Sequence, residues 1–83
     1  MSYKIAFKKS VGRDLKRIGK DQADRILKKI EDELPEKADN YPSLTGKFTG
    51  LKKCRVGDYR IIYSLIGDTV LILRVRHRRE AYR

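Results

Sequence analysis

The chain has 83 residues, a length that fits one domain and leaves no room for a second. Its 21 Lys and Arg residues against 11 Asp and Glu give a formal net charge of +10, which excludes a simple acidic or neutral carrier protein. A single cysteine, Cys54, and a single histidine, His77, exclude a disulfide framework within one chain, a Cys-rich zinc site and a cluster of His ligands. We therefore expect no metal and no cofactor.

The positive charge is concentrated in the second half of the chain. Residues 1–41 carry 11 basic and 8 acidic side chains, whereas residues 42–83 carry 10 basic and 3 acidic ones. The second half is therefore the expected source of a positive field, and its natural partner is RNA, DNA or an acidic protein segment.

Two absences indicate where the protein resides. No apolar run approaches the roughly 18 residues of a membrane span, and the longest such run is Val70–Leu73. The N-terminal segment also lacks the apolar core of a secretion signal. We expect a cytoplasmic protein with no membrane partner.

The N-terminal segment predicts a short strand and then an amphipathic helix. Tyr3–Phe7 alternates well enough for a strand. A helix capped by Ser10 and reaching Ile18 follows from apolar residues at i, i+4 and i+7, which lie on one helical face. These residues are Val11, Leu15 and Ile18. Gly19 is expected to end the helix, because glycine readily adopts the left-handed conformation there.

A second helix carries the strongest periodic signal in the chain. Asp21 is the expected N-cap, and Pro35 is expected to stop the helix. Apolar residues recur between them at i, i+3, i+4, i+7 and i+11, namely Ala23, Ile26, Leu27, Ile30 and Leu34. The prolines, glycines and small polar residues of 35–50 then predict a long loop.

The remainder of the chain predicts three strands joined by the tight turns Gly57-Asp58 and Gly67-Asp68. The strands are Lys52–Val56, Tyr59–Ile66 and Thr69–Arg76. The order βααβββ predicts an α+β domain, in which a two-helix hairpin packs on one face of a mainly antiparallel four-stranded sheet.

Alternation along these strands directs the cations to one face of the sheet. In the last strand, one face is expected to carry Leu71, Leu73 and Val75, and the other Ile72, Arg74 and Arg76. The basic side chains expected on the face away from the helices are Lys53, Arg55, Arg60, Arg74 and Arg76. Like charges on neighbouring strands destabilise the pairing, so this cationic face favours an anion-binding role over a merely solvated surface.

Three segments resemble the RelE/ParE superfamily of toxins from prokaryotic toxin–antitoxin pairs. They are SLTGKFTGLKK at Ser43–Lys53, RVGDYRIIY at Arg55–Tyr63 and HRREAY at His77–Tyr82. The resemblance implies one RelE-like toxin domain over residues 1–83, in the RelE branch. It implies a ribosome-dependent endoribonuclease that cleaves mRNA in the A site and inhibits translation. Its implied partners are the ribosome, mRNA and a cognate RelB-like antitoxin with an acidic or amphipathic segment.

The resemblance also implies a site. Arg60 matches a family arginine that binds phosphate at the cleavage point, and Arg78 matches an arginine implicated in the chemistry. Tyr82 matches a C-terminal tyrosine of the RelE branch, and His77 falls where members vary, some of them with histidine. The further residues expected to bind RNA or phosphate are Lys52, Lys53, Arg55, Arg74, Arg76 and Arg79.

The chemistry of RNA cleavage is compatible with these residue types. When the 2′-hydroxyl attacks the adjacent phosphorus, its proton must be removed, the leaving 5′-oxygen must be protonated, and added negative charge on phosphorus must be stabilised. Arginines suit the last task, because the guanidinium meets phosphate oxygens in two parallel hydrogen bonds. The general base stays open between Tyr82, whose phenolate surrounding cations would favour, and His77.

Two other functions stay open at this point. A ParE-like toxin shares the fold but inhibits DNA gyrase by binding and lacks a nuclease centre. A plain RNA-binding module, for instance a ribosome-associated protein, would use the same basic face. Growth arrest on induction separates both toxins from the RNA-binding module.

Overall fold

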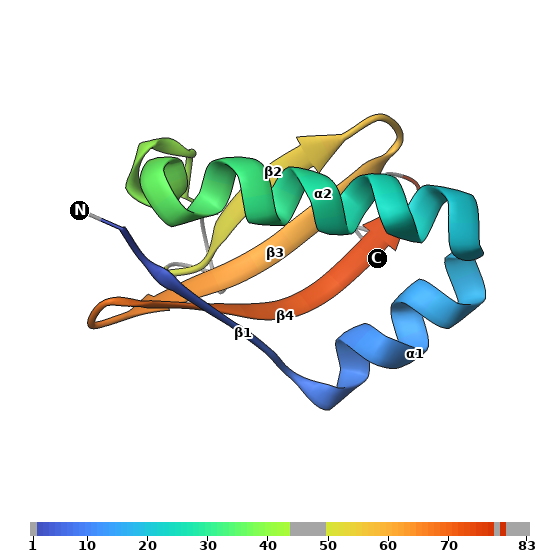
Figure 1. The fold of residues 1–83 in the computed structure, drawn as a ribbon, viewed down its shortest axis with the longest axis horizontal. Coiled ribbons are helices and arrows are strands. Elements are labelled where there is room, and N and C mark those ends of the chain that lie inside the picture. Colours follow the sequence, from blue (N-terminus) through green and yellow to red (C-terminus); the bar gives the residue numbers. More distant parts are fainter. Residues whose placement is uncertain (1, 44–49, 78, 80–83) are drawn as a thin grey trace.

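The computed structural model describes residues 2–43, 50–77 and 79. Its elements follow the predicted order βααβββ (Figure 1). They are β1 (Lys4–Phe7), α1 (Lys9–Ile18), α2 (Lys20–Lys37), a 3-10 turn η1 (Ala38–Asn40), β2 (Lys52–Val56), β3 (Tyr59–Ile66) and β4 (Thr69–His77). The predicted α+β class is confirmed. No helix in this described part of the chain is long and apolar enough to cross a membrane.

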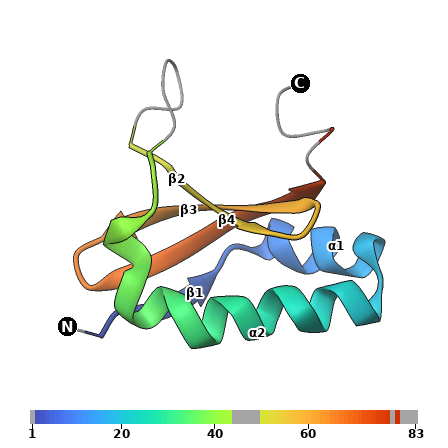
Figure 2. The ribbon, with the colours of Figure 1, turned by 90° about the horizontal axis from the view of Figure 1, so that it is seen from above.

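The four strands form one sheet in the order β1-β4-β3-β2. The consecutive strands β2, β3 and β4 pair antiparallel, whereas β1 pairs parallel to β4. Both helices lie on the same side of this sheet, and no described helix or strand covers the other side (Figure 2). We call that other side the open face. Because no described helix or strand packs on it, its side chains are candidates for contact with a partner.

The core lies between α2 and the sheet. Helix α2 contributes Ile26, Ile30 and Leu34, all fully buried, and they are four residues apart because one face of the helix must meet the strands. The strand side chains opposite them are Cys54, Ile61, Tyr63, Val70, Ile72 and Val75. Burial of each large aliphatic side chain contributes about 1.5–3 kcal/mol, so this layer holds the helices against the sheet.

The predicted helix ends are partly wrong. Helix α1 begins at Lys9, and Ser10 lies inside it rather than capping it, because its hydroxyl donates to the carbonyl of Leu73 at 2.8 Å. Helix α2 has Gly19 as its N-cap, with Asp21 in its first turn. The helix also continues through Pro35 to Lys37. The ring removes one helical hydrogen bond, but Leu34 and Ala38 on either side of it are fully buried against the core.

The predicted faces of β4 are wrong for two residues. Ile72 is buried on the helix side together with Val75, whereas Leu71 pairs with Ser64 and lies on the open face. The pairing between β3 and β4 changes register, because Ile62 pairs with Arg74 and Tyr63 pairs with Ile72. Leu73 is therefore passed over, as in a β-bulge, and an extra residue reverses the alternation of side chains. The two halves of β4 consequently follow different face patterns.

Candidate nucleic-acid interface

Three arginines form a row across the open face. Arg55 in β2 pairs with Arg60 in β3, and Arg60 pairs with Arg76 in β4. Residues directly opposite in antiparallel strands have Cα atoms about 4.5–5.5 Å apart and point to the same side. We call these three residues the arginine row. The predicted placement of Arg55, Arg60 and Arg76 on the face away from the helices is confirmed.

Lys53 extends the arginine row along β2. It pairs with Ile62, so its side chain also points to the open face, two residues from Arg55. The Arg55 side chain is exposed, and its Nε donates to the Gly57 carbonyl at 3.0 Å. Four cations from three strands therefore share one surface, and this surface attracts anions.

A pocket of about 340 Å³ adjoins the arginine row at the outer edge of β2. Lys53, Arg55 and Arg60 line it, and so do Tyr41, Pro42 and Cys54. The backbone before β2 forms the wall, because the Lys53 N–H donates to the Pro42 carbonyl at 3.2 Å. The pocket therefore combines cations with an aromatic ring and a proline ring, a lining compatible with a nucleotide. The sequence did not indicate Tyr41 or Pro42, since they lie in a segment without periodicity.

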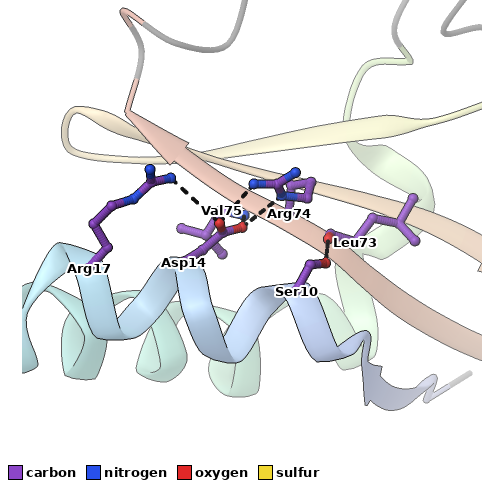
Figure 3. A network of polar contacts seen from close by, with 6 residues as sticks. All are labelled: Ser10, Asp14, Arg17, Leu73, Arg74 and Val75. Atoms are coloured by element: carbon purple, nitrogen blue, oxygen red, sulfur yellow. Dashed lines mark hydrogen bonds and ion pairs between the residues drawn. The ribbon is translucent and has the colours of Figure 1, made fainter.

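Arg74 is held by an acid from the first helix instead of joining the arginine row. Its Nε and Nη2 donate to the two oxygens of Asp14 at 2.9 Å each (Figure 3). Asp14 also accepts a 2.9 Å hydrogen bond from the Val75 N–H, and the Arg17 guanidinium lies 3.8 Å from it. The sequence groups Arg74 with the phosphate-binding cations, whereas the structure pairs its charge with a buried carboxylate.

The pKa of Asp14 reflects this surrounding. Burial alone raises the pKa of a carboxyl group, but the hydrogen bonds from Arg74 and the Val75 N–H and the positive charges of Arg74 and Arg76 outweigh burial, so the pKa of Asp14 lies below its ordinary value. Asp14 therefore stays ionised at neutral pH. The sequence does indicate that Asp14 faces the core, because it stands three residues after Val11 and four before Ile18, inside the apolar stripe of α1.

Two predicted site residues lie on the helix side of the sheet. Lys52 pairs with the buried Tyr63, and its Nζ donates to the carbonyls of Asp39 and Tyr41 at 3.4 and 2.9 Å. His77 pairs with Tyr59, and the two rings meet edge to face with centroids 5.4 Å apart. Alternation therefore separates both residues from the arginine row, and the structure does not bring His77 to Arg60.

The remaining predicted residues lie at the C-terminal end. Arg78 and Tyr82 are outside the described residues. Arg79 is exposed in a turn, and its N–H donates to His77 Nδ1 at 3.2 Å. Cys54, expected as a small core residue, is buried, and burial raises the pKa of its thiol. Its placement argues for packing and against reactivity.

Comparisons with known proteins place this geometry in a family. The profile of the ParE toxin of type II toxin–antitoxin systems matches residues 5–82. The toxin–antitoxin complex RelBE2 from Mycobacterium tuberculosis includes a chain that is 25% identical, with a TM-score of 0.86, over 93% of this chain and 99% of that one. A chain of the archaeal RelE-RelB complex from Pyrococcus horikoshii is 30% identical, with a TM-score of 0.69, over 98% of this chain and 100% of that one.

A mutant of the toxin RelE from E. coli, solved in the free state, shows the same fold. It is 16% identical, with a TM-score of 0.78, over 98% of this chain and 88% of that one. A search of curated protein sequences finds no significant match.

Proposed function

Because the chain belongs to the ParE toxin family of type II toxin–antitoxin systems, within the RelE branch of the RelE/ParE superfamily, we propose that this toxin is a ribosome-dependent endoribonuclease that cleaves mRNA in the A site. The observation that carries the proposal is the arginine row, in which Arg55, Arg60 and Arg76 stand side by side on three strands. A surface of this kind fits the phosphates of a single RNA strand laid across the open face.

Arg60 has the central role in the proposed reaction. It lies between the other two arginines and also lines the pocket at the edge of β2. A phosphate there would be contacted from both sides, and charge that develops on its oxygens during attack would be stabilised by guanidinium groups already in place. Lys53 and Arg55 would hold the flanking phosphates and fix the strand direction.

The bond changes follow from the attack of the 2′-oxygen. That oxygen loses its proton to a base and forms a bond to phosphorus, while the bond from phosphorus to the 5′-oxygen breaks and the 5′-oxygen takes up a proton. The products carry a 2′,3′-cyclic phosphate and a 5′-hydroxyl. Tyr82 is the favoured base in this proposal, because His77 points to the helix side of the sheet beside Tyr59.

An antitoxin is the second proposed partner. The solved relatives RelBE2 and the archaeal RelE-RelB pair are toxin–antitoxin complexes. We propose that the antitoxin of this toxin presents an acidic or amphipathic segment that covers the open face. Such a segment would neutralise the arginine row and block access of RNA to it.

A ParE-like inhibitor of DNA gyrase is the alternative. The matching family profile is that of a ParE toxin, and this observation favours it. In that case the arginine row would contact a partner without any bond being broken. The two functions differ in whether new mRNA ends form and whether DNA supercoiling is inhibited.

The test is inducible expression of the wild type beside Arg60→Ala, with Arg25→Ala as the matched control. Arg25 is exposed on α2, so the control removes one positive charge away from the open face. We expect the wild type and the control to arrest growth and to generate mRNA ends that primer extension detects. For Arg60→Ala we expect the growth arrest and the yield of new mRNA ends each to be at least about 100-fold weaker.

The purified proteins separate the two functions. Cleavage of mRNA in the presence of ribosomes and poor cleavage without them supports the proposal. Equal cleavage of naked RNA contradicts ribosome dependence. Inhibition of gyrase supercoiling by the wild type, together with no cleavage under either condition, establishes the ParE-like alternative.

A further inference from the structure

A second group of cations lies on α1, away from the open face. Lys9, Arg13 and Lys16 are exposed, and the Arg17 side chain is 66% exposed. They recur at spacings of three and four residues, so they occupy one side of the helix. That side is opposite Val11, Leu15 and Ile18, which pack toward the core. We call the four cations the α1 basic face.

The α1 basic face is electrostatically unfavourable for an isolated helix. Lys9 and Arg13, and Arg13 and Arg17, are like charges four residues apart, and such pairs destabilise a helix. The first turn of α1 contains no acidic residue, and Lys8 and Lys9 stand at the end where the helix dipole disfavours cations. The dipole favours only Lys16 and Arg17, in the last turn.

The single acid of α1 only partly relieves this repulsion. Asp14 turns inward, and its carboxylate is held by Arg74 and the Val75 N–H, with Arg17 at its edge (Figure 3). Helix α2 provides an internal comparison, because its five basic and six acidic residues are mixed along its length. In α2 the Lys29 ammonium pairs with Glu33 four residues on. The unbalanced charge is therefore a property of α1 and not of helices in this chain generally.

The surface of α1 also lacks the features of a protein interface. No large apolar or aromatic side chain is exposed on it, and Gly12 stands among the cations with nothing within 4 Å of the place where a Cβ would be. Cores of protein interfaces are rich in aromatic residues and poor in lysine. Surfaces that bind single strands use aromatic rings for stacking. A straight row of cations about 12 Å long on a rigid helix instead suits regularly spaced phosphates.

We propose that the α1 basic face binds the sugar–phosphate backbone of double-helical RNA, as a docking surface separate from the arginine row. Phosphates would offset the repulsion among the four cations, and the exposed Gly12 would let the RNA backbone approach the helix closely. The choice of RNA over DNA rests on the proposed endoribonuclease function. The docking surface would orient the toxin on a folded RNA while the open face receives a single strand.

The experiment measures binding to a short RNA duplex with 2′-O-methyl sugars, which cannot undergo attack by a 2′-hydroxyl. Fluorescence anisotropy gives the dissociation constant for the wild type between about 50 and 200 mM salt. The test variant combines Lys9→Gln, Arg13→Gln and Lys16→Gln. The matched control combines Arg25→Gln, Lys28→Gln and Lys37→Gln, which removes three exposed positive charges from α2.

We expect the test variant to bind the duplex at least about 10-fold more weakly, and the slope of log K against log salt to become shallower by about 2 to 3. The control is expected to change the slope by less than about 1. Urea unfolding checks that the test variant is folded, and it should be at least as stable as the wild type because like-charge pairs have been removed.

Three outcomes overturn the proposal. Equal losses in the two variants would show that net charge alone acts. Unchanged duplex binding with weakened binding of the cognate antitoxin would assign the α1 basic face to a protein partner. A loss confined to a DNA duplex of the same sequence would reject RNA as the ligand. Cleavage assays with Arg60→Ala test the proposed nuclease separately, because that substitution leaves α1 unchanged.

Discussion

Asp14 of α1 and Arg74 of β4, 60 positions apart in the chain, are joined by two parallel hydrogen bonds of 2.9 Å. The pair lies beside the part of β4 that extends past the end of β1, because β1 pairs with β4 only as far as Ile72. Beyond that point side chains of α1 take the place of a neighbouring strand, with Ser10 bonded to the Leu73 carbonyl and Asp14 to the Val75 N–H. Helix α1 thereby fixes the part of β4 that carries Arg76.

Asp14→Ala is expected to lower the free energy of unfolding by about 2–4 kcal/mol. The substitution leaves the Val75 N–H without its acceptor and removes the carboxylate that accepts two hydrogen bonds from Arg74. Urea unfolding measures the loss. Arg17→Ala is the matched control, and it should cost less than about 0.5 kcal/mol because that guanidinium is largely exposed and 3.8 Å from the carboxylate. Equal effects would refute the special role of the Arg74 pair.

The stability of the toxin should fall in acid partly through Asp14. Its pKa is lower in the folded chain than in the unfolded chain, so the unfolded chain binds more protons near pH 4 and below. The contribution is complete above about pH 5 and is lost as the pH falls through the folded-state pKa. Urea midpoints measured between about pH 2 and 6 should vary less steeply for Asp14→Asn than for the wild type. Parallel curves would contradict this account.

The neighbouring lysines of β2 should have different roles. Lys53 points to the open face, whereas the Lys52 ammonium is bonded to the carbonyls of Asp39 and Tyr41 on the helix side. Lys53→Ala should weaken RNA binding by about 10-fold with an unchanged melting temperature. Lys52→Ala should lower the free energy of unfolding by about 1 kcal/mol and leave RNA affinity within about twofold. Fluorescence anisotropy and thermal unfolding of both variants measure the two effects. A loss of RNA affinity in Lys52→Ala and a loss of stability in Lys53→Ala would contradict the prediction.

Gly12→Ala should stabilise the toxin by about 0.5–1 kcal/mol. Gly12 lies inside α1, and a Cβ there would meet nothing within 4 Å, so alanine adds helix propensity at no steric cost. Gly57→Ala is the contrasting variant, because Gly57 has a φ of 57° in the turn between β2 and β3. This substitution should destabilise the protein by about 1 kcal/mol. Chemical unfolding of the two variants measures both signs.

Alternation in the sequence predicted the face of every cation in the arginine row, because β2, β3 and the part of β4 after the change of register are regular. It predicted the wrong face for Leu71 and Ile72, since a change of register depends on how two strands meet and leaves no mark in one strand alone. The role of Arg74 was missed for a related reason. Its partner lies on a helix that only the tertiary fold brings to the edge of β4. His77 was expected at the site from the family resemblance and Lys52 as a basic residue beside Lys53, although their positions along the strands place both on the helix side of the sheet.

The parallel pairing of β1 with β4 has a consequence during synthesis. Among the described strands, β1 pairs only with β4, which spans residues 69–77, so the first strand synthesised cannot pair until the last one has been made. A nascent chain that stops before β4 lacks both the centre of its sheet and Arg76, the third member of the row. Assembly of the arginine row is thus deferred until β4 has been synthesised and has left the ribosomal exit tunnel.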